Sequence, residues 1–287
     1  MSGLTLPTST STEERLAKGA IWGVALAVTG VFLWIVGDIV VHGIGGLSLS
    51  FITDEPERGG RAGGIFPILV STFAILAVAL VVAIPLGLGT AVLLAEFTKR
   101  GNWFASVVAR SLDVLAAVPS IVFGLFGNAF FCVWLGLGYS ILAGGLTLAC
   151  MVLPILIRSL EAAFRAVPDD YRVAATALGM SRTRTVVSVL FPQATPGLVV
   201  GLVLGIGRVL AETAALLFTS GYVDRMPESV MDSGRAISIH IFDLAMNVPG
   251  GEPNAYTSAL VLIILLLVIN FTASWGGDRW VRRATGR

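Results

Sequence analysis

The sequence has little charge. Asp, Glu, Lys and Arg make up 13% of its 287 residues, whereas 55% of the residues are hydrophobic. Because about a quarter of the residues in a typical soluble domain are charged, this composition excludes such a domain and indicates an integral membrane protein. The net charge of +1 supplies no overall field that would attract nucleic acid, so no nucleic-acid partner is expected.

Reactive side chains are scarce as well. The two cysteines, Cys132 and Cys150, lie inside apolar runs, which predicts small core residues rather than a disulfide framework. The two histidines, His42 and His240, stand apart from each other, and no metal-ligand spacing can be built from them. The sequence therefore gives no indication of a metal site or a cofactor.

The residues of an ATPase or a membrane enzyme are missing too. Neither lysine, Lys18 or Lys99, follows a glycine, so the chain has no G-K-[ST] phosphate-binding loop. The apolar runs offer few groups for catalysis, and Asp113 is expected to pair with Arg110, three residues earlier. The ionisable residues in those runs are Asp38, Asp113, Arg208 and Glu212. This set lacks the converging nucleophile, acid or metal ligands of an enzyme site.

Long apolar runs dominate what is present. They predict an all-α membrane protein with six spans, at about residues 20–41, 66–95, 112–134, 140–160, 197–222 and 255–276. Residues 1–19 are predicted to form an N-terminal tail, rich in Ser and Thr and disordered over its first twelve residues, before a membrane domain at 20–287. Residues 224–254 are predicted to form a polar segment outside the membrane.

The stretch 161–192 between the fourth and fifth spans is both polar and patterned. Pro168 can start a helix whose first turn carries two aspartates, and Gly179 can end it in the left-handed conformation. Ser181 is a plausible N-cap for a second helix that ends at Pro192. The apolar face of the first helix consists of Tyr171, Ala174, Ala175 and Leu178. Because both alanines are expected to be exposed, this face predicts a docking site for a soluble partner.

Basic residues are unevenly distributed among the loops. The tail, the second loop, the stretch 161–192 with Arg158 just before it, and the C-terminal end hold 2, 3, 5 and 4 of them, together 14 of 19. The loops on the other side hold four arginines. By the positive-inside rule, both termini and the stretch 161–192 face the cytoplasm.

The fifth predicted span contains an ion pair within a stripe of small residues. Arg208 and Glu212 follow glycines at 197, 201 and 205, and Arg208 lies about 15 Å into the span at 1.5 Å per residue. Because a charge at this depth is costly, Arg208 should pair with Glu212. The pair has two interpretations. It forms a site for an anion, whose oxygens match the guanidinium fork, or it fixes helix register or binds a second subunit.

Two motifs carry a family resemblance. The pattern Val173-Ala174-Ala175, three residues, Gly179, nine residues, Val189-Leu190-Phe191-Pro192 resembles the EAA loop of ABC-importer permeases, with Val173 in place of the glutamate. The segment "GRVLAETAALLFTSG" at 207–221 resembles "ARAxGETAPLLFTA" of the PstA-type permeases of phosphate-specific ABC transporters, with Ala211 and Ala215 as departures. Further similar segments, such as "LDVLAAVPSIVFGLFGNAFF" at 112–131, extend the resemblance over most of the chain from about residue 47.

The resemblance implies a six-helix permease subunit with the type I ABC-importer fold in a bacterial inner membrane. It implies a PstC-like permease as its partner, ATPase subunits docked on the EAA loop, and a binding protein that delivers phosphate. Arg208 and Glu212 would serve translocation, whereas Ala174, Ala175 and Gly179 would serve coupling to the ATPase. Two alternatives stay open: a permease for another oxyanion, such as sulfate or molybdate, or a regulatory membrane subunit that signals phosphate status.

Overall fold

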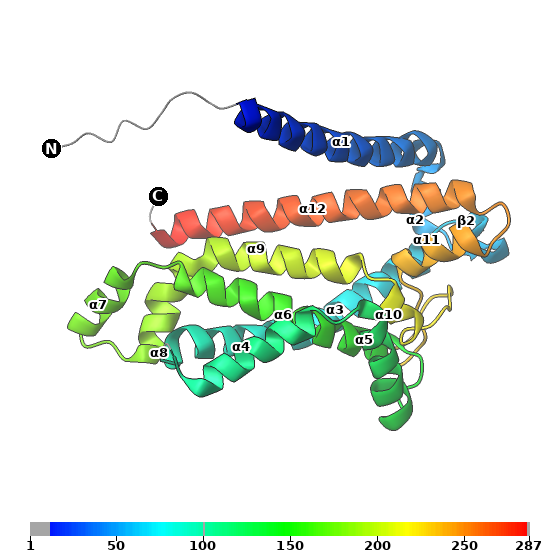
Figure 1. Ribbon diagram of the computed structural model, residues 1–287. Helices are drawn as coiled ribbons and strands as arrows, with labels where there is room; N and C mark the ends of the chain where they lie inside the picture. Colours follow the sequence, from blue (N-terminus) through cyan, green and yellow to red (C-terminus); the bar gives the residue numbers. More distant parts are fainter. Residues whose placement is uncertain (1–11, 100, 286–287) are drawn as a thin grey trace.

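The computed structural model describes residues 12–99 and 101–285, and nearly all of its elements are helices (Figure 1). The long helices are α1 (Thr12–Gly43), α3 (Phe66–Val92), α6 (Ile141–Arg165), α9 (Phe191–Leu210) and α12 (Glu252–Thr285). The shorter α-helices are α2 (Leu49–Thr53), α4 (Trp103–Ala116), α5 (Ser120–Gly127), α7 (Asp169–Ala177), α8 (Arg182–Thr185), α10 (Ala214–Leu217) and α11 (Ile237–Met246).

Tighter and wider helical turns complete the chain. The 3₁₀ turns are η1 (Ile44–Gly46) and η2 (Arg58–Gly60), and the π-helical segments are η3 (Leu93–Phe97), η4 (Asn128–Trp134) and η5 (Val186–Leu190). Strands β1 (Pro56–Glu57) and β2 (Ala62–Gly63) pair antiparallel in the first loop. Most of the predicted disordered tail lies outside the described residues. Residues 12–19, also predicted as tail, instead form the first two or so turns of α1.

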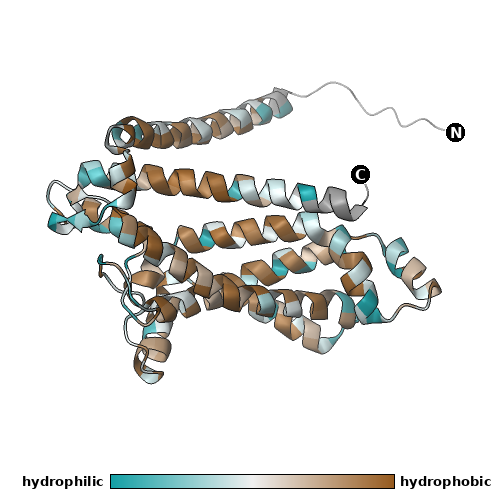
Figure 2. Ribbon diagram, turned by 180° about the vertical axis from the view of Figure 1, so that it is seen from behind, coloured by the Kyte–Doolittle hydropathy of each residue, from teal (hydrophilic) through white to brown (hydrophobic). Residues whose placement is uncertain are grey.

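The predicted all-α membrane architecture is confirmed. Among the described residues, five helical stretches are long and apolar enough to cross a membrane, and a bent pair makes a sixth. The hydrophobic colouring of Figure 2 runs along these helices, while hydrophilic residues gather at the ends of the molecule and in its loops. Helices satisfy all their backbone hydrogen bonds internally, which is why a chain this apolar folds as a set of helices.

The third span differs from the prediction. Instead of one helix at 112–134, α4 already starts at Trp103, and the chain bends by 99° between α4 and the continuous α5–η4 segment. Pro119 is the N-cap of α5. Proline disfavours helical geometry in the residue before it and has no N–H to continue the ladder, so the break falls there.

The fifth span also begins and ends earlier than predicted. The helical stretch runs from Arg182 to Leu210 rather than over 197–222. Ser181 does cap this stretch by accepting a hydrogen bond from the Arg184 N–H at 3.4 Å, but the helix does not end at Pro192. The π-helical segment η5 ends at Leu190, and Pro192 is the second residue of α9, a position where the missing N–H is tolerated.

The core forms around α6. Helix α3 packs along one side of α6 and α9 along another, and Leu148, Val152 and Leu156 of α6 are fully or almost fully buried between them. The predicted small-residue stripe of α9 makes the second contact possible. A Cβ atom on Gly201 would come within 2.9 Å of the Ser159 Cβ atom, so only glycine allows this approach.

Helix α1 lies at the edge of the molecule and packs mainly on α12 (Figure 1). Its most apolar stretch has no buried residue. Near its end, Tyr256 of α12 donates a hydrogen bond to the Asp38 carboxylate at 3.1 Å. The surface of α1 is therefore apolar on nearly all sides, as expected for a helix surrounded by lipid or by another chain.

The α6–α9 packing makes a testable prediction. Gly201→Val should lower the thermal stability of the purified protein, by the roughly 1–3 kcal/mol that overpacking costs, because its side chain would collide with Ser159. Gly207→Val is the matched control, since no atom lies within 4 Å of a Cβ at that position of the same helix. Equal melting temperatures for the two variants would contradict the packing described.

Candidate functional site

Arg208 and Glu212 form the predicted ion pair. Arg208 lies in the last turn of α9 and Glu212 two residues beyond its end, with 3.3 Å between Nη1 and Oε2. The two side chains differ in burial: the arginine is 41% exposed and the glutamate 3%. The pair therefore consists of a fixed carboxylate and a partly open guanidinium.

The surrounding chain holds Glu212 in place. Its Oε1 atom accepts a hydrogen bond at 3.2 Å from the Ala215 N–H, one of the free N–H groups in the first turn of the short helix α10. Its backbone carbonyl accepts a hydrogen bond from the Ser238 hydroxyl of α11 at 2.6 Å. The carboxylate thus retains a partner even if the guanidinium moves, and its position does not depend on Arg208.

The guanidinium lies beside the middle of α6. Its Nη2 atom is 3.9 Å from the sulfur of Met151, the eleventh residue of this 25-residue helix. At 1.5 Å per residue, Met151 is about 15 Å from the start of α6, which is about half the thickness of a bilayer core. The guanidinium is therefore level with the middle of α6, although Arg208 itself lies two residues before the end of the stretch Arg182–Leu210.

The segment predicted to be polar and external contains the buried helix α11. Ile237, Ile239 and Leu244 are fully buried, and the backbone N–H of Ile237 donates to the Thr72 hydroxyl of α3 at 2.9 Å. Helix α11 also packs on α12. The prediction missed this helix because the charged residues on both sides of it dominate the composition of the segment.

A buried polar cluster anchors α11. The Arg235 guanidinium donates to the Asp243 carboxylate at 3.0 Å and to the Tyr222 carbonyl at 2.8 Å. The His240 ring lies beside it, with 3.5 Å between Arg235 Nη1 and His240 Nδ1, and Gly60 of the first loop covers the ring. Burial, together with the positive charge of Arg235, lowers the pKa of His240 to about 3. The histidine is therefore neutral at physiological pH.

The stretch 161–192 contains the helix–glycine–helix pattern that the sequence predicts. Helix α7 starts after Pro168, carries Asp169 and Asp170 in its first turn, and is followed by Gly179 at φ +71°. Figure 1 shows α7 projecting from one end of the molecule, far from α10. The site at Arg208 and the helix α7 are thus separate features joined by α9.

One part of the predicted docking face is wrong. Tyr171 is 40% exposed, Leu178 is 80% exposed and Ala174 is also exposed, but Ala175 is only 2% exposed. Helix α7 packs against η5, and the Met180 N–H closes the end of α7 by donating to the Ala175 carbonyl at 3.0 Å. Ala175 is therefore a buried residue of the loop and not part of its outer surface.

Several ion pairs near α7 were not predicted. Asp113 pairs with Arg158 of α6 at 2.7 Å and not with Arg110 as expected, because the bend after α4 brings α4 alongside α6. Arg165 pairs with Glu161 at 2.8 Å, a contact that the four-residue spacing could have suggested. Arg172 pairs with Glu96 at 2.6 Å across 76 positions of the chain, which no local pattern reveals.

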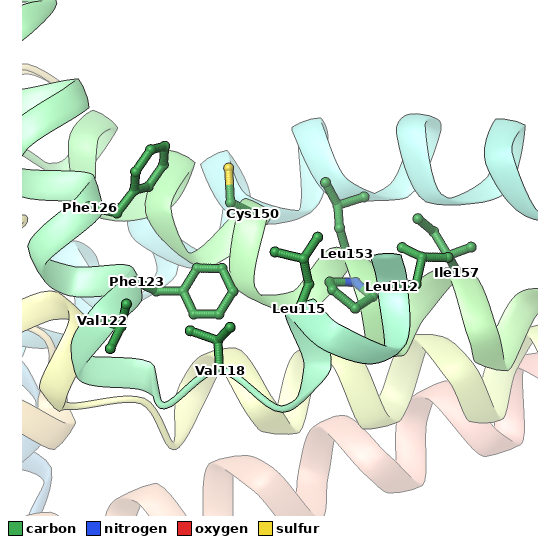
Figure 3. Close-up of a pocket in the computed structure, with 10 residues that line it drawn as sticks. Leu112, Leu115, Val118, Val122, Phe123, Phe126, Cys150, Leu153 and Ile157 are labelled. Carbon is green, nitrogen blue, oxygen red and sulfur yellow. The ribbon is translucent and has the colours of Figure 1, made fainter. Parts of the chain in front are cut away.

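An apolar cavity of about 520 Å³ lies between the α4–α5 bend and α6 (Figure 3). Its ten lining residues, among them Leu115, Phe123 and Leu153, are all apolar or weakly polar. Such a lining offers no donor to an oxyanion, so this cavity is not a candidate anion site. Within residues 12–99 and 101–285, no three His, Cys, Asp or Glu side chains come together as a metal site would require.

The low pKa of His240 predicts a dependence of stability on pH. As the pH falls below about 6.5, the unfolded chain binds a proton that the folded protein does not, so the free energy of unfolding should fall by about 1.4 kcal/mol per unit. This loss should continue towards the folded-state pKa of about 3. Between pH 6.5 and 5, denaturant unfolding of His240→Gln should lack this contribution. The same dependence of the free energy of unfolding on pH in the wild type and in His240→Gln would contradict this prediction.

The comparisons with known proteins identify the family. Residues 83–286 match the family described as "Binding-protein-dependent transport system inner membrane component". The chain is 33% identical to the probable ABC transporter permease YqgI of Bacillus subtilis, over 95% of this chain and 97% of that protein. It is 39% identical to the phosphate transport system permease protein PstA of Mycobacterium leprae, over 88% of this chain and 85% of that protein.

Solved structures support the same fold. A bacterial ABC transporter involved in the import of the acidic polysaccharide alginate matches with a TM-score of 0.61 at 13% identity, over 93% of this chain and 99% of that one. At this identity the match shows the type I importer permease fold alone. Together with the sequence relatives, it places the chain among the multi-pass inner-membrane proteins. The chain belongs to the family of inner-membrane components of binding-protein-dependent transport systems, as a permease of the PstA type.

Proposed function

We propose that this protein is the permease subunit of an ATP-driven importer and translocates inorganic phosphate into the cytoplasm. The observation that carries the proposal is the half-open guanidinium of Arg208, which lies level with the middle of α6 and beside a buried carboxylate. It lies in the segment 207–221, which resembles the PstA-type permeases, and several relatives are named as phosphate transport permeases.

The chemistry of the pair suits an oxyanion. A guanidinium presents N–H donors in a planar fork that matches two phosphate oxygens, and it keeps its charge at any physiological pH. Glu212 holds this fork from one side, while its own position is fixed by Ala215 and Ser238. The exposed side of Arg208 is then available to the anion. A second, PstC-like permease subunit would enclose it there and complete the pathway.

The EAA loop, residues 161–192, is proposed to bind an ATPase subunit in the cytoplasm. The exposed residues Tyr171, Ala174 and Leu178 form the docking face, and the small side chain of Ala174 allows a partner's backbone to come close. Ala175 and Gly179 shape the loop from within. This arrangement requires both termini to be cytoplasmic, as the distribution of basic residues indicates.

The external loops and helix α7 would serve the delivery and the transport of phosphate. Apart from the buried Arg235–Asp243 pair, the external loops carry seven acidic residues and three arginines. Such a surface does not attract free phosphate and favours transfer from a docked phosphate-binding protein. Closure of the ATPase dimer would move α7 and open the Arg208 region to the outside, in an alternating-access cycle. The relatives named for phosphate transport disfavour sulfate or molybdate as the substrate.

ATP-dependent uptake of labelled phosphate by the assembled complex tests the substrate. Unlabelled sulfate and molybdate serve as competitors. We expect phosphate uptake that neither competitor reduces, because the other oxyanion permeases lack the segment 207–221. Uptake of sulfate or molybdate without phosphate would leave the fold and the EAA loop intact but would exclude the proposed substrate. Association with the other subunits without any uptake would favour the regulatory alternative.

Substitution of the arginine tests the site. Arg208→Gln should reduce uptake by roughly 10- to 100-fold, the effect of losing charge-assisted hydrogen bonds worth about 1.5–3 kcal/mol. The complex should still assemble, because Glu212 retains its hydrogen bond from Ala215. Arg225→Gln removes an exposed arginine outside this site and is the matched control. An assembled Arg208→Gln complex with unchanged uptake would rule out the anion site.

A further inference from the structure

Arg172 of α7 forms a bidentate ion pair with Glu96. Its Nη2 and Nε atoms donate to the two carboxylate oxygens at 2.6 and 3.1 Å. Glu96 belongs to the π-helical segment η3, which continues α3 without a break. Both side chains are largely buried, the arginine 25% exposed and the glutamate 10%. A forked pair of this kind fixes orientation as well as distance, so it joins α7 rigidly to the end of α3.

The same guanidinium binds two other parts of the loop. It donates to the backbone carbonyls of Phe164 and Val167, at the end of α6 and just after it, at 2.8 and 2.7 Å. It also donates to Asp169 in the first turn of α7 at 3.1 Å. A single side chain thus connects the ends of α3 and α6 with α7.

These contacts lie against the start of the fifth span. A cavity of about 200 Å³ is lined by Glu96 and Arg172 on one side and by Thr185, Val186 and Leu190 on the other. Val186 and Leu190 belong to the π-helical segment η5. π-helical turns interrupt regular helices and often occur at functional sites. The Arg172–Glu96 ion pair therefore lies between two helical stretches, and each of them has a π-helical segment, η3 or η5, beside the pair.

The covalent connections of α7 do not reach α3. Residues 166–168 connect α7 to α6, and residues 178–181, with Gly179 at φ +71°, connect it to the helix that becomes α9. Glu96 is 76 positions away from Arg172 in the chain. Any displacement of α7 must therefore pass to α3 through side chains, and the Glu96 pair provides such a path.

We infer that Arg172 and Glu96 form a strut that transmits the movement of α7 to α3, and so couples ATP hydrolysis to transport. The inference rests on the proposed function, in which an ATPase subunit binds α7. Both residues are positioning residues, because neither contacts the anion at Arg208. The α3 helix packs along α6, beside which Arg208 lies, so its displacement would alter the surroundings of the anion site.

The coupling ratio is the measurement that tests the strut. ATP hydrolysis and phosphate uptake are measured in the same proteoliposomes that contain the whole complex. Glu96→Gln removes the charge and one acceptor oxygen while preserving size. We expect it to raise the ATP hydrolysed per phosphate carried by about tenfold, within the usual range of coupling between distant sites. Asp113→Asn breaks the Arg158–Asp113 ion pair between α4 and α6, which lies outside the EAA loop and does not involve α7, and it should keep the ratio of the wild type.

A merely structural role gives a different result. Hydrolysis and uptake would then fall together in proportion to the amount of assembled complex, and an unchanged ratio in Glu96→Gln would overturn the inference. If Glu96→Gln does not assemble, Glu96→Asp keeps the charge but withdraws the carboxylate by one methylene. It should then give an intermediate ratio, and a wild-type ratio would overturn the inference in that case as well.

The test also separates this inference from the proposed substrate. If the wild-type complex carries another oxyanion, the proposed substrate fails. The coupling ratio can still be measured with the anion that is carried. That ratio then decides whether Arg172 and Glu96 form a strut.

Discussion

A charge inside a bilayer must have its counter-charge close by, and this requirement organises the protein more than any apolar contact does. The paired arginines occur at the places where helices end or meet. Arg208 joins Glu212 just after the end of α9, and Arg235 joins the residues before α11 to Asp243 within it and to the Tyr222 carbonyl. Two pairs connect different helices: Arg158 of α6 binds Asp113 of α4, and Arg172 of α7 binds Glu96 after α3. Because the apolar side chains of a span are interchangeable with lipid, they give little information on which helix lies next to which. These two pairs supply part of that information.

Burial divides these pairs into two kinds. In the Arg235–Asp243 pair both side chains are at least four-fifths buried, and the neighbouring His240 is kept neutral, so the cluster acts as a fixed anchor. In the Arg208–Glu212 pair only the carboxylate is buried. The arginine side chain is therefore the partner that can move, while the glutamate stays in place. This difference in burial is what the proposed role in transport requires, and the buried Arg235–Asp243 pair lacks it.

The sequence predicted the features that depend on local chemistry. The six apolar runs, the N-cap at Ser181, the left-handed Gly179 and the pairing of Arg208 with Glu212 all follow from composition or from spacings of four residues or fewer. The errors arose where distant segments decide. The bend at Pro119 brings α4 to α6 and gives Asp113 a partner other than Arg110, and Ala175 is buried, with α7 packed against the separate segment η5. Helix α11 was missed because the charged residues on both sides of it dominate the composition of the segment, whereas its burial by α3 and α12 depends on contacts with distant parts of the chain.

The position of α1 has a consequence for biosynthesis. Its main neighbour, α12, is the last helix of the chain, so the contact between them can form only after all the intervening spans have been synthesised. Until then α1 has to remain in the membrane without this neighbour, which the apolar surface of its central part permits. The contact between α1 and α12 is therefore one of the late steps in the assembly of the fold.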